Sequence, residues 1–442
     1  MKHYIVIGAG ISGLATAWFL KQRFGATVKI TILEKEERSG GWIKTVQREG
    51  FLFDTGPRSC RTRGSGQATL QLLEALGLQD EIIPCSPEAR HRYLFTQGHL
   101  KRLPSSLLGA CLSPLTRRFL PLLWKERNIP PANLADETIA SFMTRRFSKA
   151  FAEELFDPLT LGIYAGNSHA LSFPSCFPEF ANHEKHYGSL VRALWQQKRE
   201  KNQKMNQFPI ITLKGGMEIL TRSLGHALKE HLVLNTPVLS ISPSESGIVV
   251  KTSQKQLAAD HVYVCTPAHA IPHFIPPLAE PLKQFSTATV AAVHLGWNKS
   301  VLTKRGFGYL VPTKENEPIL GVIFDSSVFP QQNQHEKQTR LTVMLGGTVG
   351  VPVVEMSDDA LIALSKKSLY KHLGLQQPPH VAFVSRAINA IPQYTLGHQS
   401  RVTALNEEID SLFHSKVTLM GSSWNGVSVN DCIQESYERG RF

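Results

Sequence analysis

The amino-acid sequence predicts an α/β protein whose parallel sheet is assembled from separated stretches of the chain. Three observations lead to this prediction. The chain opens with a short apolar strand, a glycine-rich turn and a helix pattern. Strand patterns of the same kind return within residues 208–275 and again within residues 415–442. The stretches between these segments differ in character, as expected if other domains are inserted there.

The first strand and helix flank a turn with three glycines. The strand is predicted over Tyr4–Ile7, which is apolar and largely β-branched, and the helix over Ser12–Arg23. At this spacing Gly8 permits a tight turn, Gly10 lets backbone approach a pyrophosphate, and Gly13 lets the helix pack closely on the strand. The start of the helix then points free N–H groups at the phosphates.

A carboxylate follows the second predicted strand. That strand covers Ala26–Leu33, and Glu34 stands 21 residues beyond Gly13. This is close to the ~20 residues expected for the carboxylate that holds a ribose hydroxyl. A helix over Gly66–Leu76 closes the segment 1–84. These features favour a dinucleotide site over an ordinary strand–turn–helix connection.

Two later segments add strands to the same domain. Residues 208–275 contain a helix pattern after Gly216, and the strands predicted there are Val233–Ile241, Ile248–Thr252 and Asp260–Thr266. Residues 415–442 contribute a strand over Lys416–Met420 and a final helical stretch.

The intervening stretches predict two further domains. Residues 85–207 carry several prolines, helix patterns at Thr138–Phe147 and Ala150–Phe156, and a charged break at Lys198–Lys204 that is typical of a loop. Residues 276–414 mix strands with helices. We therefore expect a Rossmann-like domain of discontinuous segments, α/β in itself and α+β with its insertions. The expected divisions are 1–84, 208–275 and 415–442 for that domain, 85–207 for a mainly helical domain, and 276–414 for a mixed-sheet domain.

Composition limits the kinds of partner and site. The 442 residues carry a net charge of +12, which favours anionic partners such as nucleic acid, acidic lipid or a carboxylated substrate. No nucleic-acid recognition motif supports the first of these, and we expect no nucleic-acid partner.

The six scattered cysteines form no CxxC pair, and His183–His186 (HEKH) is not HExxH, so no disulfide framework or metal site is expected. The apolar N-terminal run leads straight into the glycine turn and is expected to be part of the fold.

Three further motifs point to a flavin. Arg38 with Gly40 and Gly41 adds backbone amides and a cation next to the first glycine turn, which an NAD domain does not need. The turn Phe53–Ser59 (FDTGPRS) contains an arginine whose charge could tune a reduced flavin. The segment Gly421–Asp431 (GSSWNGVSVND) leads from a strand into a helix start and offers N–H groups to a ligand.

The motifs are spread over about 420 residues: GAGISGL (8–14), SGGWI (39–43), DTGPRS (54–59), YAGN (164–167), GFGYLVP (306–312), LGVIFDS (320–326) and GVSVNDCI (426–433). In this set the chain resembles the FAD amine oxidase-like superfamily and, within it, the oxygen-dependent protoporphyrinogen oxidases. The Ser-Gly-Gly-Cys segment by which monoamine oxidases attach flavin is missing, so the resemblance implies one non-covalent FAD per chain.

The resemblance also implies which residues contact FAD. They lie in the two glycine turns, at the end of the second strand, in the Gly-Pro turn, and in two later segments. The expected residues are Gly8, Ala9, Gly10, Ile11, Ser12, Gly13, Glu34, Lys35, Arg38, Gly41, Trp42, Gly56, Pro57, Arg58, Ser59, Val238, Ser422, Val427, Ser428 and Val429. Because the flavin carries the hydride chemistry, no catalytic side chain is expected.

The implied substrate is a porphyrinogen, oxidised to a porphyrin with O₂ as acceptor and H₂O₂ as product, in heme biosynthesis. Arg92 is expected to pair with a propionate, and Phe307 and Leu310 to enclose a pyrrole ring. The carbonyl of Gly162 is expected to accept pyrrole N–H bonds. The two weaker wall candidates are Ile323 and Met344.

The resemblance further implies a peripheral membrane protein on the cytoplasmic side, with a possible homodimer. Leu100–Asn128 mixes Leu, Phe and Trp with six Lys and Arg, which suits a membrane interface. An internally packed helical subdomain would give the same composition.

Three alternatives stay open. The substrate could be coproporphyrinogen III, which has more carboxylates. The chain could also be another flavin oxidoreductase of this fold, such as a carotenoid desaturase or an amine oxidase in which Trp424 forms one wall of an aromatic cage. The fold could finally serve a non-catalytic carrier.

Overall fold

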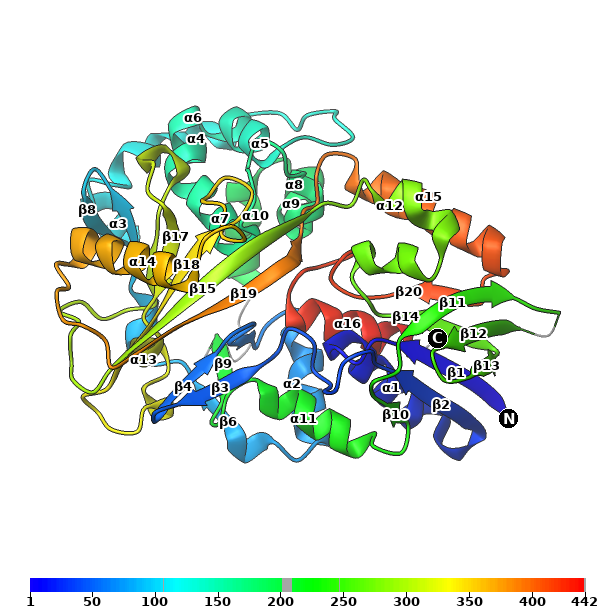
Figure 1. The fold of residues 1–442 in the computed structure, drawn as a ribbon. Helices are drawn as coiled ribbons and strands as arrows, with labels where there is room; N and C mark the ends of the chain where they lie inside the picture. Colours follow the sequence, from blue (N-terminus) through cyan, green and yellow to red (C-terminus); the bar gives the residue numbers. More distant parts are fainter. Residues whose placement is uncertain (106, 201–208, 246, 441–442) are drawn as a thin grey trace.

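A computed structural model describes residues 1–105, 107–200, 209–245 and 247–440 (Figure 1). It confirms the predicted α/β fold. A five-stranded parallel sheet has the order β10-β2-β1-β14-β20. Its strands are β1 (Lys2–Ile7), β2 (Val28–Leu33), β10 (Leu232–Val233), β14 (His261–Val264) and β20 (Val417–Leu419). In register, Ile7 lies beside Leu33 and Val264, so the carboxyl ends of the central strands meet at one edge.

Helices cover one face of this sheet. They are α1 (Ile11–Phe24), α2 (Gly66–Ala75), α11 (Glu218–Ala227) and α16 (Val429–Arg439). The side chains of β1 alternate, so Val6 packs under these helices while Ile5 and Ile7 face the opposite side. That side carries α15 (His398–Phe413) and an antiparallel sheet of β11 (Val238–Pro243), β12 (Ile248–Thr252) and β13 (Gln256–Ala259).

A second large sheet lies beside the first. Its seven strands have the order β19-β15-β18-β17-β16-β7-β8. They are β7 (Arg92–Thr96), β8 (His99–Leu103), β15 (Thr287–Trp297), β16 (Gly308–Leu310), β17 (Ile319–Ile323), β18 (Thr339–Gly346) and β19 (Val381–Pro392). Helix α14 (Asp358–Leu373) packs on one face. The β7–β8 hairpin joins this sheet, although its residues fall in the stretch 85–207 for which a mainly helical domain is expected.

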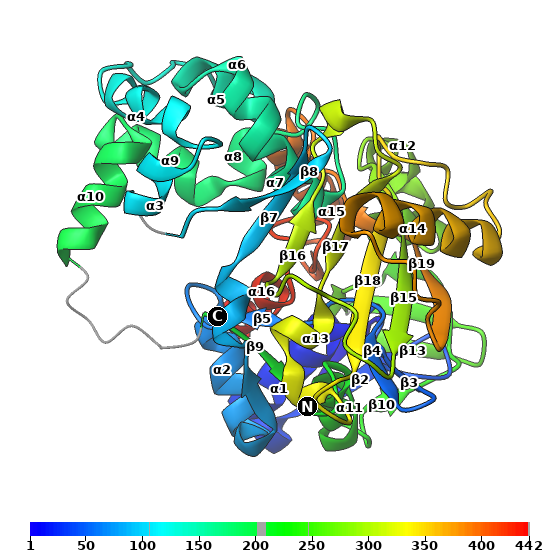
Figure 2. The same cartoon turned by 90° about the vertical axis from the view of Figure 1, so that its left-hand side faces the viewer.

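Short helices gather beside the second sheet, at the upper left of Figure 2. They are α3 (Leu107–Leu112), α4 (Leu120–Glu126), α5 (Ile139–Arg146), α6 (Lys149–Phe151), α7 (Asp157–Tyr164), α8 (Phe173–Cys176), α9 (Pro178–Tyr187) and α10 (Leu190–Glu200). A fully buried ion pair between Glu126 and Arg146 ties α4 to α5. Glu126 also accepts the N–H of Leu190, which fixes the start of α10.

Small sheets and helices connect the two large sheets. They are β3 (Thr45–Arg48), β4 (Phe51–Asp54), β5 (Cys60–Arg61), β6 (Ile82–Pro84), β9 (Ile210–Leu213), α12 (Ala279–Leu282) and α13 (Asp325–Val328). Strands β3 and β4 form a hairpin, and β5, β6 and β9 form a three-stranded sheet.

Two element predictions were wrong. The strand expected over Val233–Ile241 is split between β10 and β11, which belong to different sheets, and Pro237 lies between them without an N–H to donate. The loop expected over Lys198–Lys204 is helical in α10 up to Glu200, and the rest of it lies outside the described residues.

Within the described ranges, no helix combines the length and the apolar character that crossing a membrane requires.

Candidate active site

The first glycine turn lies at the carboxyl end of β1. Gly8 has a φ of +96°, and a Cβ atom on Gly13 would stand 1.9 Å from the carbonyl oxygen of Gly8. Gly10 differs, because a Cβ there would meet nothing within 4 Å. Helix α1 starts directly after it with no side-chain cap. The turn therefore packs tightly on its protein side and leaves free space and uncapped N–H groups on the other.

The carboxylate of Glu34 is held next to this turn. One oxygen accepts the N–H of Ala9 at 2.6 Å and the other accepts the N–H of Glu36 at 3.0 Å. The side chain is almost fully buried, and each oxygen retains a second lone pair for a ligand hydroxyl. The N–H of Thr236 bonds to the carbonyl of Glu34, which brings Val238 to the same edge.

The second glycine pair lies directly on the first turn. Gly40 donates its N–H to the carbonyl of Ala9 at 2.7 Å, and Gly10 and Gly40 form a parallel bridge. Arg38 folds back over the loop and donates to the carbonyl of Gly41 at 2.6 Å. A cation therefore lies at the loop beside the first turn. The Lys35 side chain, by contrast, is 72% exposed and pairs with a neighbouring carboxylate.

The Gly-Pro turn continues this series of contacts. A Cβ atom on Gly56 would stand 1.9 Å from the carbonyl oxygen of Trp42, so only glycine permits the approach. Two residues later, Arg58 donates from Nη1 to Asp325 Oδ1 at 3.0 Å, with its side chain 17% exposed. Arg58 is therefore a buried partner of the second sheet's connections and not a surface arginine.

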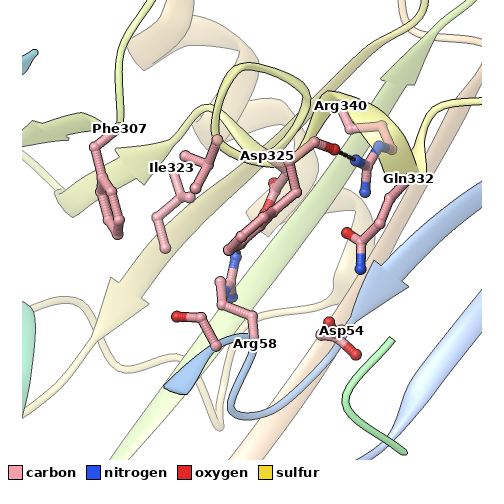
Figure 3. Close-up of a pocket in the computed structure, with 10 residues that line it drawn as sticks. Asp54, Arg58, Phe307, Ile323, Asp325, Gln332 and Arg340 are labelled. Atoms are coloured by element: carbon pink, nitrogen blue, oxygen red, sulfur yellow. Dashed lines mark hydrogen bonds and ion pairs between the residues drawn. The ribbon is translucent and has the colours of Figure 1, made fainter. Parts of the chain in front are cut away.

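A pocket lies where the Gly-Pro turn meets the second sheet (Figure 3). Its lining residues are Asp54, Arg58, Ser59, Phe307, Ile323, Asp325, Val328, Phe329, Gln332 and Arg340. Phe307 and Ile323 stand on one side of the view, and Arg340 and Gln332 on the other. The pocket brings two predicted cofactor residues, Arg58 and Ser59, together with two predicted substrate residues, Phe307 and Ile323.

The predicted substrate residues of the sheet share one face. Arg92 lies opposite Gly308, which lies opposite Ile323. In the next row Leu310 lies opposite Gly321, which lies opposite Met344. Side chains two positions apart on a strand point the same way, so both rows belong to the face opposite α14. The exposed Arg92 has its guanidinium 5.4 Å from the ring centroid of Phe307.

Helix α7 closes the far end of this face. The Leu310 side chain lies within 2.9 Å of the position that a Cβ of Gly162 would take. Gly162 is exposed and near the end of α7, where carbonyl groups lack partners within the helix.

The C-terminal segment returns to the first glycine turn. The Tyr394 hydroxyl donates to the carbonyl of Ser422 at 2.5 Å and accepts the N–H of Gly426 at 2.8 Å. A Cβ on Gly421 would stand 3.1 Å from Ser12 Oγ, so this loop lies against the start of α1. The side chain of Ser428 is used within the segment itself, because it caps α16; Val427 and Val429 flank it.

Sequence reasoning missed several buried polar residues. Thr266 follows β14, and its hydroxyl is buried beside Gly8 with no hydrogen-bond partner among the described residues. A polar residue directly after a parallel strand lies at the edge of the sheet where ligands bind, so this position could have indicated a ligand contact from the sequence. His294, Thr342 and Asp325 lie at or near the pocket, but nothing in their local sequence indicates that they contact one another.

Three side chains considered from the sequence have other roles. Trp424 is buried in the core, with its ring 5.2 Å from that of Phe285, so it does not supply a wall of an aromatic cage. His183 and Glu184 lie in α9 and are buried, not solvated. Glu184 pairs with Arg145 at 2.9 Å.

Comparison with known proteins gives consistent matches over the full length. A family model described as flavin containing amine oxidoreductase matches residues 11–438. The chain is 34% identical to the protoporphyrinogen oxidase of Bos taurus, over 97% of this chain and 96% of that protein. It is 27% identical to the coproporphyrinogen III oxidase of Bacillus subtilis, over 98% and 96%. A crystal structure from Exiguobacterium sp. 255-15, named provisionally as a protoporphyrinogen oxidase, has a TM-score of 0.84 at 25% identity and covers 100% of this chain and 98% of that chain.

The buried carboxyl group of Asp54 gives a pH-dependent prediction. Burial raises its pKa to about 6, with the hydrogen bonds from Thr45 and Met217 opposing the shift. Because its pKa in the folded state exceeds that in the unfolded state, the folded protein gains stability from this group as the pH falls from 7 toward 5. We expect Asp54→Asn to be at least as stable as the parent at pH 7.5 and to lose that advantage at pH 5.

Thermal unfolding midpoints at both pH values test this expectation. The exposed Asp80→Asn serves as the matched control and should follow the parent at both. A difference between Asp54→Asn and the parent that is constant with pH would show that Asp54 titrates normally.

Proposed function

The chain belongs to the family of flavin containing amine oxidoreductases, and we propose that within this family it is an FAD-dependent protoporphyrinogen oxidase. It oxidises protoporphyrinogen IX to protoporphyrin IX with O₂ as acceptor and H₂O₂ as product, in heme biosynthesis. The main support is the pocket that joins Arg58 and Ser59 to Phe307 and Ile323, in a chain that matches protoporphyrinogen oxidases over nearly its whole length.

FAD is the cofactor, and the first glycine turn fits it. The free space at Gly10, the uncapped start of α1 and the unpartnered hydroxyl of Thr266 lie together at the carboxyl edge of the parallel sheet. The N–H groups of α1 and the guanidinium of Arg38 would hold the diphosphate, and Glu34 a ribose hydroxyl. When bound, FAD accepts hydride from the substrate and passes electrons to O₂.

The chain's own residues bind and orient the substrate. Arg92 would pair with a propionate at the edge of the pocket, while its contact with the Phe307 ring limits where the guanidinium can lie. Phe307 and Leu310 would enclose a pyrrole ring, with Ile323 and Met344 as walls. The exposed carbonyl of Gly162 would accept pyrrole N–H groups. These contacts would hold one carbon of the macrocycle against the flavin.

The domain division follows from the same proposal. Residues 1–84, 208–275 and 415–442 would form the FAD-binding domain, since all strands of the parallel sheet lie in them. Residues 276–414, with the β7–β8 hairpin added, would form the substrate-binding domain. The remaining residues of 85–207 would form the helical membrane-associating domain.

Exposed aromatic side chains support the proposed peripheral association with a membrane surface. Trp124 on α4 is 68% exposed and Trp195 on α10 is 51% exposed, with ring centroids 6.4 Å apart. The guanidinium of Arg127 lies over both rings, at 5.3 and 4.6 Å. Lys125 is exposed beside them. Aromatic rings with adjacent cations are suited to the boundary between lipid headgroups and acyl chains.

Coproporphyrinogen III is the second candidate substrate, supported by the match to the Bacillus subtilis enzyme at lower identity. A paired assay on the FAD-loaded protein separates the two. Porphyrin fluorescence and O₂ consumption are followed with each porphyrinogen in air. Faster turnover of protoporphyrinogen IX supports the proposal, and faster turnover of coproporphyrinogen III replaces it. Turnover of neither, with FAD bound, rejects both.

Gly10→Val tests the cofactor site. The added Cβ would meet no protein atom within 4 Å and the side chain would occupy ligand space, so the variant should fold and lose its bound FAD. Visible flavin absorbance per protein and the melting temperature of the apoprotein are measured. Gly13→Val is the contrast, because its Cβ would collide with the carbonyl of Gly8 and should also lower that temperature. A yellow Gly10→Val protein would remove the turn from the FAD site.

Arg92→Ala tests the propionate contact. Loss of a charge-assisted hydrogen bond should raise KM for protoporphyrinogen IX about tenfold and lower kcat less. The matched control is Arg102→Ala, because Arg102 is also exposed but lies opposite Tyr93 and faces the other side of the sheet. Equal KM values for the Arg92→Ala variant and the parent would refute the assigned role.

Trp124→Ser combined with Trp195→Ser tests the membrane surface. Loss of two interfacial anchors should weaken sedimentation with anionic phospholipid vesicles about tenfold or more. Leu239→Ser with Tyr370→Ser is the control, since both side chains are exposed on other elements. If the two double variants bind vesicles equally, the surface around Trp124 is not the docking site.

A further inference from the structure

A continuous series of buried and half-buried polar groups, joined by hydrogen bonds, ends at Arg58. Arg58 donates to Asp325 Oδ1 at 3.0 Å, and the Thr342 hydroxyl donates to Asp325 Oδ2 at 2.8 Å. The two ring nitrogens of His294 continue the chain, Nδ1 at 3.2 Å from Thr342 Oγ1 and Nε2 at 2.9 Å from Ser385 Oγ. His294 and Thr342 are fully buried. Four hydrogen-bonded contacts thus connect the Gly-Pro turn to β18, β15 and β19.

These groups lie on the sheet face that carries the predicted substrate residues. Thr342 stands opposite Ile323 on one side and His294 on the other. In the neighbouring row, Ala292 stands between Met344 and Ser385. These hydrogen-bonded groups therefore continue the rows of predicted substrate residues across the sheet and are not a separate cluster in the core.

The hydrogen bonds from Ser385 through His294 and Thr342 to Asp325 all run in the same direction. Thr342 has one hydroxyl hydrogen and gives it to the carboxylate of Asp325, so its oxygen accepts from His294. Nδ1 of His294 then carries the hydrogen, and Nε2 of the neutral ring is an acceptor for the Ser385 hydroxyl. Among the described residues, the other acceptor near Ser385 Oγ is the carbonyl of Thr55, at 3.5 Å, which is the longer contact. Each hydrogen points toward Asp325, which stabilises the charged form of its carboxylate and fixes the orientation in which it meets Arg58.

The ring of His294 stays neutral in this position. Burial lowers its pKa to about 3, and the positive charge of Arg58 acts in the same direction. A protonated ring would carry a hydrogen on Nε2 and reverse the bond to Ser385. The assigned direction is therefore the one present at neutral pH.

We propose that Asp325, Thr342 and His294 are positioning residues that fix the guanidinium of Arg58 at the pocket wall, beside the proposed flavin site. This inference rests on the proposed function, in which the turn that contains Arg58 contacts the flavin ring. An arginine has several rotatable bonds, and one ion pair at a pocket edge leaves it mobile. With Asp325 itself held by Thr342, the charge has a fixed place from which it stabilises negative charge on the reduced flavin.

Thr342→Val is the test, because valine keeps the shape of threonine and removes only the hydroxyl. Thr342→Ser restores the hydroxyl. The matched control is Thr339→Val on the same strand, whose buried hydroxyl donates to the carbonyl of Lys299 and takes no part in the chain. FAD content, the flavin midpoint potential, and kcat and KM for the preferred porphyrinogen are measured on FAD-loaded protein.

The expected result for Thr342→Val is retained FAD, a more negative flavin midpoint potential, and a kcat lower by about tenfold with KM nearly unchanged. Thr342→Ser should recover both values, and Thr339→Val should match the parent. An unchanged midpoint potential in Thr342→Val overturns the proposal. Equal losses in the Val and Ser variants also overturn it, because they show that packing and not the hydroxyl matters.

Two outcomes separate this inference from the proposed function. If the parent turns over no porphyrinogen but Thr342→Val still shifts the flavin potential, the proposed substrate is wrong and the positioning role stands. If Thr342→Val does not accumulate as folded protein, Ser385→Ala replaces it. That variant removes the last donor of the chain and should shift the potential in the same direction by less, and an unchanged potential again overturns the proposal.

Discussion

The approach of backbone to backbone at glycine positions is the constraint on which the site depends. At Gly56 a Cβ atom would stand 1.9 Å from the carbonyl oxygen of Trp42, and at Gly13 it would stand 1.9 Å from the carbonyl oxygen of Gly8 within the first turn. The Gly56 contact and the bridge between Gly10 and Gly40 stack three turns on one another at the carboxyl edge of the parallel sheet. A larger side chain at Gly56 would separate the Gly-Pro turn from the second glycine loop and would displace Arg58 from Asp325.

The second sheet completes the site through polar groups rather than through apolar packing alone. Arg58 is bound to Asp325, and Arg340 is bound to the carbonyl groups of Leu52 and Phe329. Both cations are thus engaged with the protein, and removal of the Asp325 carboxylate would leave the charge of Arg58 uncompensated. Arg340 connects β18 to the loops at Leu52 and Phe329, while Arg58 is the cation that lies in the Gly-Pro turn.

The sequence was sufficient to predict the parallel sheet and the helix after the glycine turn. Glycine spacing and β-branched runs are local signals, and Gly8, Gly13 and Glu34 have the surroundings that they imply. The split of Val233–Ile241 into two sheets was not predicted, because apolar alternation does not reveal which sheet a strand joins. The hydrogen bonds that connect Thr342, His294 and Ser385 could not be predicted from the sequence either, because they depend on the register of three strands that are far apart in sequence.

The same register suits the proposed substrate, a large, flexible and partly charged macrocycle. In the row that contains Arg92, the strand of the hairpin carries this exposed cation, while the central strands carry the buried hydroxyl of Thr342 and the buried imidazole of His294. Charge recognition can therefore take place at the edge of the sheet, where Arg92 meets solvent and water screens it. The interior end of this row lies next to the Gly-Pro turn and is held by hydrogen bonds of the fully buried Thr342 and His294. Under the proposed function, propionate binding and electron transfer would therefore take place at opposite ends of one row of side chains.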